Sequence, residues 1–201
     1  HGLISPPARA EKKVMDRIVI TGMGVLSPAG LTLEEFWNTL VSAKPVYGPL
    51  PEWADDDRYR VKLGARLQRY DWAKDLPLKS YGKAACYCMA AAARAMEDAG
   101  LSRRSMGTRR VAVIIGTTMG EIQEEEALTE RLYGGAEGDK TVFCRKYPAY
   151  HIAHAAAELC RASGPCYVVP AACAAGNYAI AMAKQLLDGH YADIVLAGGV
   201  D

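Results

Sequence analysis

The 201-residue sequence lacks several features that would place it in a specialised class. None of its six cysteines forms a C-x-x-C pair, so the common zinc-binding and dithiol redox motifs are missing. Neither sign of charge is in excess, because 24 basic residues face 23 acidic ones, and no global field would draw in nucleic acid. The N-terminal stretch HGLISPPARAEKKV is polar, basic and proline-bearing, unlike a signal peptide. We expect reduced thiols in a cytoplasm, with no metal site and no nucleic-acid partner.

Long hydrophobic runs are also scarce, apart from Ala162–Met182, which contains no charged residue. A run of this length could span a bilayer of about 30 Å. Gly164, Pro165, Pro170 and Asn177 interrupt it, however, and a strand that turns into a buried helix explains the same composition. We therefore expect no membrane segment.

Short apolar runs alternate with helical patterns along the rest of the chain. We expect strands at Arg17–Thr21, Arg110–Gly116, Cys166–Val169 and Ile194–Ala197. We expect helices from Thr32 to Pro45, Ser80 to Gly100, Glu121 to Tyr133, Pro148 to Cys160 and Ala174 to Asp188. Residues 45–77 form a surface excursion with one strand-like stretch at Arg60–Leu67. This alternation predicts an α/β layer structure with both faces of the sheet covered.

Two helices carry clear end signals. Thr32 and Glu35 have the spacing of a capping box, and Gly100 stands where a left-handed residue commonly ends a helix. The face of the first helix is expected to be core, because apolar residues recur on it: Leu33, Phe36, Trp37, Leu40 and Val41.

Cys173 is the first candidate for chemistry, because it stands between a predicted strand and a predicted helix, among small residues (PAACAAG). Helix N-termini offer unpaired N–H groups and favour the thiolate form of cysteine, which is the nucleophile. The same N–H groups can stabilise an oxyanion. Free cysteine is equally at home as a small buried residue, so the spacing alone leaves catalysis and core packing both open.

The remaining cysteines and histidines have weaker surroundings. His151 and His154 precede Cys173 without a third metal ligand, and we expect them to be structural. We expect His190 to cap a turn, and we expect Cys86 and Cys88 to pack on different sides of one helix. No elbow surrounds the other three cysteines: Cys144, Cys160 and Cys166. Gly22-x-Gly24 lacks the third glycine of a dinucleotide-binding motif.

The run PAACAAGNYAIAMAKQLLDGHYADIVLAGGVD resembles the active-site segment of the β-ketoacyl synthases, with a cysteine on a tight elbow, a helix, a G-x-x-D turn and an AGG strand end. RIVITGMGVLSPAGLTLEEFW is similar to that family's first strand and helix, AAARAMEDAGL to its alanine-rich helix, and VAVIIGTTMGE to its central strand and glycine turn. The resemblance covers residues 16–201 and corresponds to the family's first half. It implies an α/β, thiolase-like layered fold (α/β/α/β/α), of which this chain supplies the N-terminal half.

The resemblance also implies an activity and a division of the chain. Residues 15–201 would be the N-terminal domain of a β-ketoacyl synthase without its C-terminal half, and residues 1–14 a linker or extension. Cys173 would accept an acyl group from the phosphopantetheine arm of an acyl carrier protein. Decarboxylative Claisen condensation with a malonyl-type extender would follow, in fatty acid or polyketide biosynthesis. Met119 would line the acyl pocket, and no tightly bound cofactor is expected.

Family members are typically homodimers, so we expect self-association through residues 166–169. They decarboxylate the extender with two histidines and usually a lysine, which would lie beyond Asp201, in the C-terminal half of the synthase. Two alternatives stay open. One is a thiolase-like enzyme that uses acyl-coenzyme A, and the other is a half-synthase subunit or binding module that needs a partner for condensation.

Overall fold

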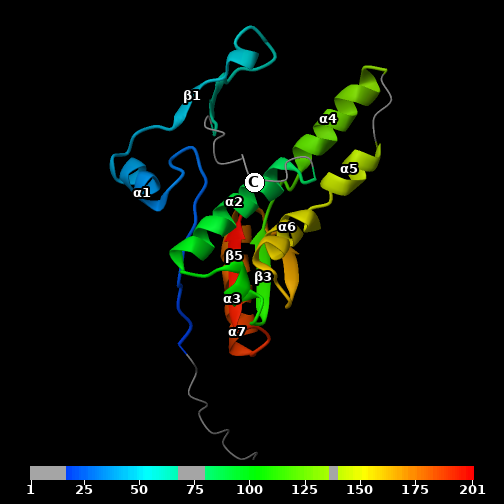
Figure 1. Ribbon diagram of the computed structural model, residues 1–201. Helices are drawn as coiled ribbons and strands as arrows, with labels where there is room; N and C mark the ends of the chain where they lie inside the picture. The colour runs from blue at the N-terminus through cyan, green and yellow to red at the C-terminus, as the bar shows by residue number, and fades with distance from the viewer. Residues whose placement is uncertain (1–16, 68–79, 136–139) are drawn as a thin grey trace, which may run out of the picture.

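The computed structural model describes residues 17–67, 80–135 and 140–201, and it is built around a three-stranded parallel sheet (Figure 1). The strand order is β4-β3-β5, with β3 at Val111–Gly116, β4 at Cys166–Val169 and β5 at Ile194–Gly199. Gly116 pairs with Val169 on one side and with Gly199 on the other, so the three strands end at one edge. The predicted extension at residues 1–14 lies outside the described ranges.

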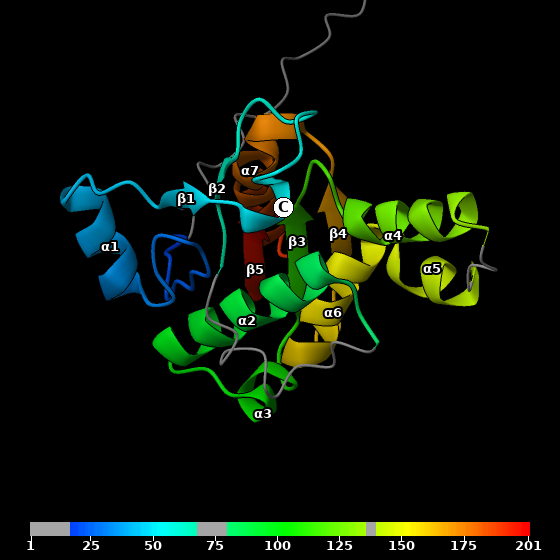
Figure 2. The same ribbon diagram turned by 90° about the horizontal axis from the view of Figure 1, so that it is seen from above.

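Helices cover both faces of this sheet, as the sequence predicts. The helices α2 (Lys83–Asp98) and α6 (Tyr150–Cys160) lie on one face, and α7 (Ala175–Asp188) lies on the other (Figure 2). Side chains of β3 alternate between the two layers: Val113 and Ile115 pack with α2 and α6, whereas Ile114 packs against α7. Every residue of β3 is buried, which explains its continuous apolar sequence.

The predicted strand at Arg17–Thr21 is wrong for this structure. The residues have no regular secondary structure, and the side chain of Ile20 is 79% exposed. The chain that follows lies against α2, where a Cβ atom on Gly24 would stand 1.9 Å from the carbonyl oxygen of Ala91. The small residues of α2 therefore accommodate this segment at close range, and α2 also packs against the neighbouring helix α6.

The predicted helix ends are largely confirmed. The hydroxyl of Thr32 accepts the N–H of Glu35 at 3.1 Å, while the carboxylate of Glu35 accepts the N–H of Leu31. Gly100 adopts a left-handed φ of +65° directly after the cap of α2. The first helix, α1 (Leu33–Val41), ends four residues before Pro45, with Ala43 in the left-handed region.

The predicted core face of α1 is a second error. Trp37, Leu40 and Val41 are 65%, 52% and 66% exposed, and α1 has no buried residue. The helix lies at the periphery of the described structure (Figure 1), and on this face only Leu33 and Phe36 are half-buried. Amphipathic periodicity tells which residues share a face, but not whether a partner lies against that face.

The other elements are short or stand apart from the sheet. Strands β1 (Tyr47–Pro49) and β2 (Leu63–Ala65) form an antiparallel pair, so only the middle of the strand-like stretch 60–67 is a strand. The helices α4 (Ile122–Tyr133) and α5 (Lys140–Lys146) form a hairpin that projects from the body (Figure 2). The sequence did not predict α5. The remaining short helices in the described ranges are η1 (Pro51–Trp53), α3 (Arg103–Met106) and η3 (Ala172–Ala174). Among the described helices, none is long and apolar enough to cross a membrane.

Candidate active site

Cys173 lies at the turn between β4 and α7, in the short helix η3. Cys173 is a free cysteine and an exposed residue. The residue before it, Ala172, has a left-handed φ of +46°, a conformation that costs a non-glycine residue on the order of 1–3 kcal/mol. Ala174, the N-cap of α7, makes no side-chain cap, and the N–H groups of Ala174 and Ala175 donate to the carbonyl oxygens of Ala171 and Ala172. The predicted elbow is therefore present, and the thiol is accessible on it.

Three glycines allow the start of α7 to lie directly on the strand ends. A Cβ atom on Gly116 would stand 2.2 Å from the carbonyl carbon of Ala175 and 2.6 Å from the nitrogen of Gly176. A Cβ on Gly199 would stand 3.3 Å from the Cα of Gly176. The residues that follow Cys173 therefore pack directly against the backbone of the strand ends, with no side chain in between.

The turn after β3 stands at the same edge of the sheet and contains Met119, which is 56% exposed. Oδ1 of Asp201, just beyond β5, accepts hydrogen bonds from the hydroxyl of Thr117 and the N–H groups of Thr118 and Met119, at 2.7–2.8 Å. Partial burial acts to raise the pKa of Asp201, but these donors outweigh it and the pKa is lowered. The sequence did not single out Asp201, although it stands in the AGGVD run.

Glu121 follows this turn and is a buried carboxylate that the sequence also missed. Its residue is 2% exposed, and its two oxygens accept the N–H groups of Ala84 and Ala85 at 3.0 and 2.7 Å, at the N-terminus of α2. Burial raises the pKa of Glu121 and outweighs the opposing effect of these two donors. A helix N-terminus stabilises a negative charge, so the carboxylate acts as a cap that comes from a distant part of the sequence.

The other thiols have different surroundings from Cys173. Cys86, Cys88 and Cys160 are buried, as packing residues should be. Burial raises the pKa of Cys86 to about 11 and that of Cys88 to about 12, so these thiols stay protonated at neutral pH. Cys144 and Cys166 are exposed but lie within α5 and β4, away from any strand-to-helix elbow.

Three histidines lie in the described residues, two on α6 and one in the turn after α7. His154 stands 3.6 Å from Glu158 one turn along α6, and burial together with His154 lowers the pKa of His151. His190 is exposed, with a left-handed φ of +56° just beyond the C-cap of α7. Within the described ranges, no three side chains of His, Cys, Asp or Glu are grouped as a metal site would require.

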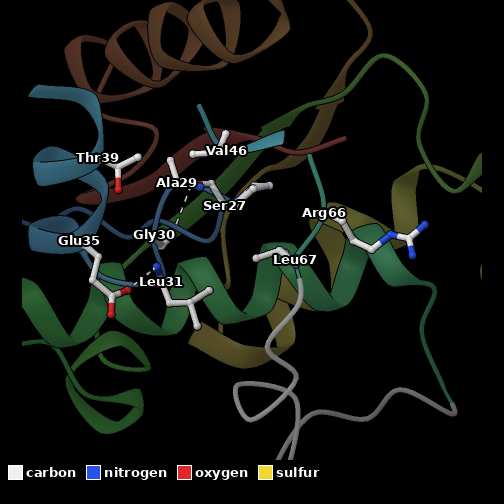
Figure 3. Close-up of a pocket in the computed structure, with 10 residues that line it drawn as sticks. Ser27, Ala29, Gly30, Leu31, Glu35, Thr39, Val46, Arg66 and Leu67 are labelled. Carbon is white, nitrogen blue, oxygen red and sulfur yellow. Dashed lines mark hydrogen bonds between the residues drawn. The ribbon is translucent and has the colours of Figure 1, made fainter. Parts of the chain in front are cut away.

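A cavity of about 420 Å³ lies elsewhere, between the loop at residues 27–31, α1 and the chain after β2 (Figure 3). Neither Cys173 nor Met119 lines it. Its charged groups have partners already, because Glu35 accepts the N–H of Leu31 and Arg66 pairs with Glu52. The cavity is therefore separate from the candidate active site.

Comparison with known proteins points to one family. Residues 15–201 match the family model described as "Beta-ketoacyl synthase, N-terminal domain". The chain is 27% identical to 3-oxoacyl-[acyl-carrier-protein] synthase 2 of Synechocystis sp., over 96% of this chain and 47% of that protein. It is 26% identical to the tetracenomycin polyketide synthase ketoacyl synthase alpha subunit of Streptomyces glaucescens, over 92% of this chain and 46% of that protein. The chain thus spans about half the length of these relatives.

Solved structures agree with this result. The ishigamide ketosynthase/chain length factor superposes with a TM-score of 0.84 at 30% identity, over 93% of this chain and 48% of that chain. A type II polyketide ketosynthase bound to the hexaketide, solved with its acyl-carrier protein, gives a TM-score of 0.77 at 27% identity, over 92% and 45%. The predicted α/β, thiolase-like fold is confirmed, and the chain corresponds to its N-terminal half.

Proposed function

The chain belongs to the β-ketoacyl synthase family, and we propose that Cys173 is the nucleophile that accepts an acyl group as a thioester. The observation that supports this most strongly is the exposed thiol on a strained elbow at the start of α7. A backbone held in a rare conformation by its surroundings is a common property of active sites. The packing of α7 on the glycines at the strand ends supplies that constraint.

Acyl transfer to Cys173 would proceed by addition and elimination. The thiolate attacks the carbonyl carbon of an acyl thioester, and negative charge develops on the carbonyl oxygen. Backbone N–H groups at this elbow would stabilise that charge. The new carbon–sulfur bond remains when the bond to the donor sulfur breaks, and the donor leaves as a thiolate that takes up a proton from water.

We propose that the donor is the phosphopantetheine arm of an acyl carrier protein. Support comes from the relative whose structure was solved with its acyl-carrier protein. Condensation would follow, in which loss of carbon dioxide from a malonyl-type extender yields a carbanion that attacks the thioester carbonyl; a carbon–carbon bond forms, the carbon–sulfur bond breaks, and Cys173 is released as a thiolate. The groups that assist decarboxylation would come from the second half of the family's fold, since the relatives are about twice as long as this chain.

Met119 is proposed to line the acyl pocket. It stands at the carboxyl edge of the sheet, as Cys173 does, and its partly exposed thioether side chain is bulky and flexible. Such a side chain would shorten the space available to the acyl group.

We also propose a homodimer, formed through β4. This strand is at the edge of the described sheet, and its first two residues, Cys166 and Tyr167, are both exposed although consecutive side chains point to opposite faces. An edge that is uncovered on both faces is suited to pairing with a second copy.

We infer a cytoplasmic location from the six cysteines, all of which are free thiols.

Intact-mass measurement tests the proposed nucleophile. The purified protein is incubated with an acyl-carrier-protein thioester, beside the variants Cys173→Ala and Cys144→Ala, the latter a matched change at another exposed thiol. We expect one acyl group on the wild type and on Cys144→Ala, and none on Cys173→Ala. Loading that persists in Cys173→Ala would refute the assignment.

The same assay separates the alternatives. A thiolase-like enzyme would load from acyl-coenzyme A faster than from the carrier-protein thioester, and we expect the opposite order. A half-synthase would load Cys173 but release no condensed product when a malonyl-type extender is added. Product formation would therefore exclude a subunit that needs a partner.

A further inference from the structure

Glu121 is a buried carboxylate, and the proposed acylation of Cys173 does not explain why a charged group is buried at this position. Its carboxylate is enclosed so closely that a Cβ atom on Gly82 would stand 2.3 Å from Oε2. Each of its oxygens has its own N–H donor at the start of α2, from Ala84 and from Ala85. Burying a charge is costly unless it is hydrogen-bonded, and here both oxygens are used. The carboxylate is therefore fixed in position.

Charged side chains from two further elements surround it. Glu124 of α4 acts to raise the pKa of Glu121, and Lys146 of α5 acts to lower it. The ammonium group of Lys146 stands 3.9 Å from the carboxylate of Glu124. Glu121 thus stands where α2, the α4–α5 hairpin and the turn after β3 meet.

The turn that precedes Glu121 has little freedom of its own. Gly120 adopts a left-handed φ of +60°, and its N–H donates to the hydroxyl of Thr117 at 2.9 Å. The N–H of Met119 donates to Asp201, so one end of the turn is tied to β5. Glu121 ties the other end to α2. The turn that carries Met119 is therefore attached at both ends.

We propose that Glu121 is a positioning residue that sets the acyl-chain-length preference of the site by fixing the turn that carries Met119. This inference rests on the proposed function, because it takes Cys173 to be acylated and Met119 to line the acyl pocket. Glu121 itself is buried against α2 and acts through the turn. Changing it should alter which chain lengths are accepted, and not only how fast the site reacts.

The variant Glu121→Gln keeps the size of the side chain and removes one acceptor. The amide group presents an N–H₂ where the second backbone donor points, so one of the two contacts is lost. Glu126→Gln is the matched control, since Glu126 is an exposed residue of α4. Loading of Cys173 is measured by intact mass with carrier-protein thioesters of increasing acyl length.

In Glu121→Gln, we expect the ratio of long-chain to short-chain loading rates to change by about tenfold, within the range that small changes in an apolar pocket produce. In Glu126→Gln the ratio should stay at the wild-type value. In the Met119→Ala background, Glu121→Gln should have little further effect on the ratio, because the two residues act through one turn. A general loss of stability would instead slow every chain length equally, in both backgrounds.

Gly82→Ala provides a second variant, because its added methyl group would displace the carboxylate without changing the residue at position 121. We expect the same change in ratio. Wild type that loads no acyl group would refute the proposed function itself. Wild type that loads, with an unchanged ratio in Glu121→Gln and Gly82→Ala, would overturn only the role of Glu121. Failure of both variants to fold, judged by circular dichroism, would assign Glu121 to stability and would overturn it too.

Discussion

The carboxylate of Asp201 accepts the N–H of Met119 at 2.8 Å, although the two residues are 82 positions apart. This contact joins the end of β5 to the turn after β3, across the edge of the sheet where β4 leads to Cys173. The shape of the candidate pocket wall is therefore set by the end of a neighbouring strand.

Asp201→Ala should destabilise the protein by about 1 kcal/mol, because one hydroxyl and two N–H groups lose a charged acceptor that is partly exposed. Urea unfolding measures the change. Asp188→Ala is the control, since its carboxylate pairs with Lys184 one turn away on α7 and should contribute only a few tenths of a kcal/mol. Equal losses in the two variants would contradict the role given to Asp201.

Gly116→Ala should disturb the elbow. The added methyl group would meet the backbone of Ala175 at 2.2 Å, and backbone cannot move aside as a side chain can. Overpacking of this kind typically costs about 1–3 kcal/mol, and loading of Cys173 should slow as α7 shifts. Gly198→Ala, on the neighbouring strand β5, is the control because its methyl group would meet no atom within 4 Å. Gly116→Ala with wild-type loading and stability would show that α7 does not depend on this contact.

The sheet and its covering helices could be predicted from local patterns. β3 is buried on both faces and so has a continuous apolar sequence, and Gly100 ends α2 because the chain needs a left-handed residue there. Patterns failed where tertiary partners decide the outcome. Ile20 has a β-branched sequence around it but lies outside the sheet, and Trp37 has helical periodicity but is largely exposed.

The residues of the candidate site also fall into those that local sequence predicts and those that depend on tertiary partners. Cys173 could be found because the elbow, the small residues and the following helix are neighbours in sequence. Asp201 and Glu121 could not, because their partners are backbone N–H groups 36 to 83 positions away, and an N–H group leaves no mark in the sequence. Glu121 also precedes a run of glutamates, which conceals a buried carboxylate among exposed ones.

Glu121 predicts a pH dependence of stability. Burial raises its pKa in the folded protein above the ordinary value of 4.5, so the folded state binds the proton more tightly than the unfolded chain does. The wild type should therefore gain stability relative to Glu121→Gln as the pH falls through the raised pKa, and the gain should be complete below about pH 4.5. Urea unfolding of both proteins at a series of pH values measures the difference. A difference that shrinks toward low pH would show that the N–H donors outweigh burial.

Tyr167→Asp should break the proposed homodimer while leaving the protein able to load Cys173. The carbonyl groups of Pro165 and Val169 accept N–H groups of β3 and its continuation, so by alternation the backbone of Cys166 and Val168 faces the open edge of β4. A second copy that pairs there brings the two Tyr167 side chains, each 46% exposed, into neighbouring positions. Charges of like sign placed across such a pair are destabilising.

Light scattering at micromolar concentration measures the assembly. We expect a dimer for the wild type and for Tyr191→Asp, a matched change at a tyrosine that is 66% exposed in the turn after α7, and a monomer for Tyr167→Asp. Intact mass should show Cys173 still acylated in all three, because the thiol stands in η3, beyond the end of β4, and not on the open edge of that strand. A wild-type monomer, or a Tyr167→Asp dimer, would rule out pairing through this edge.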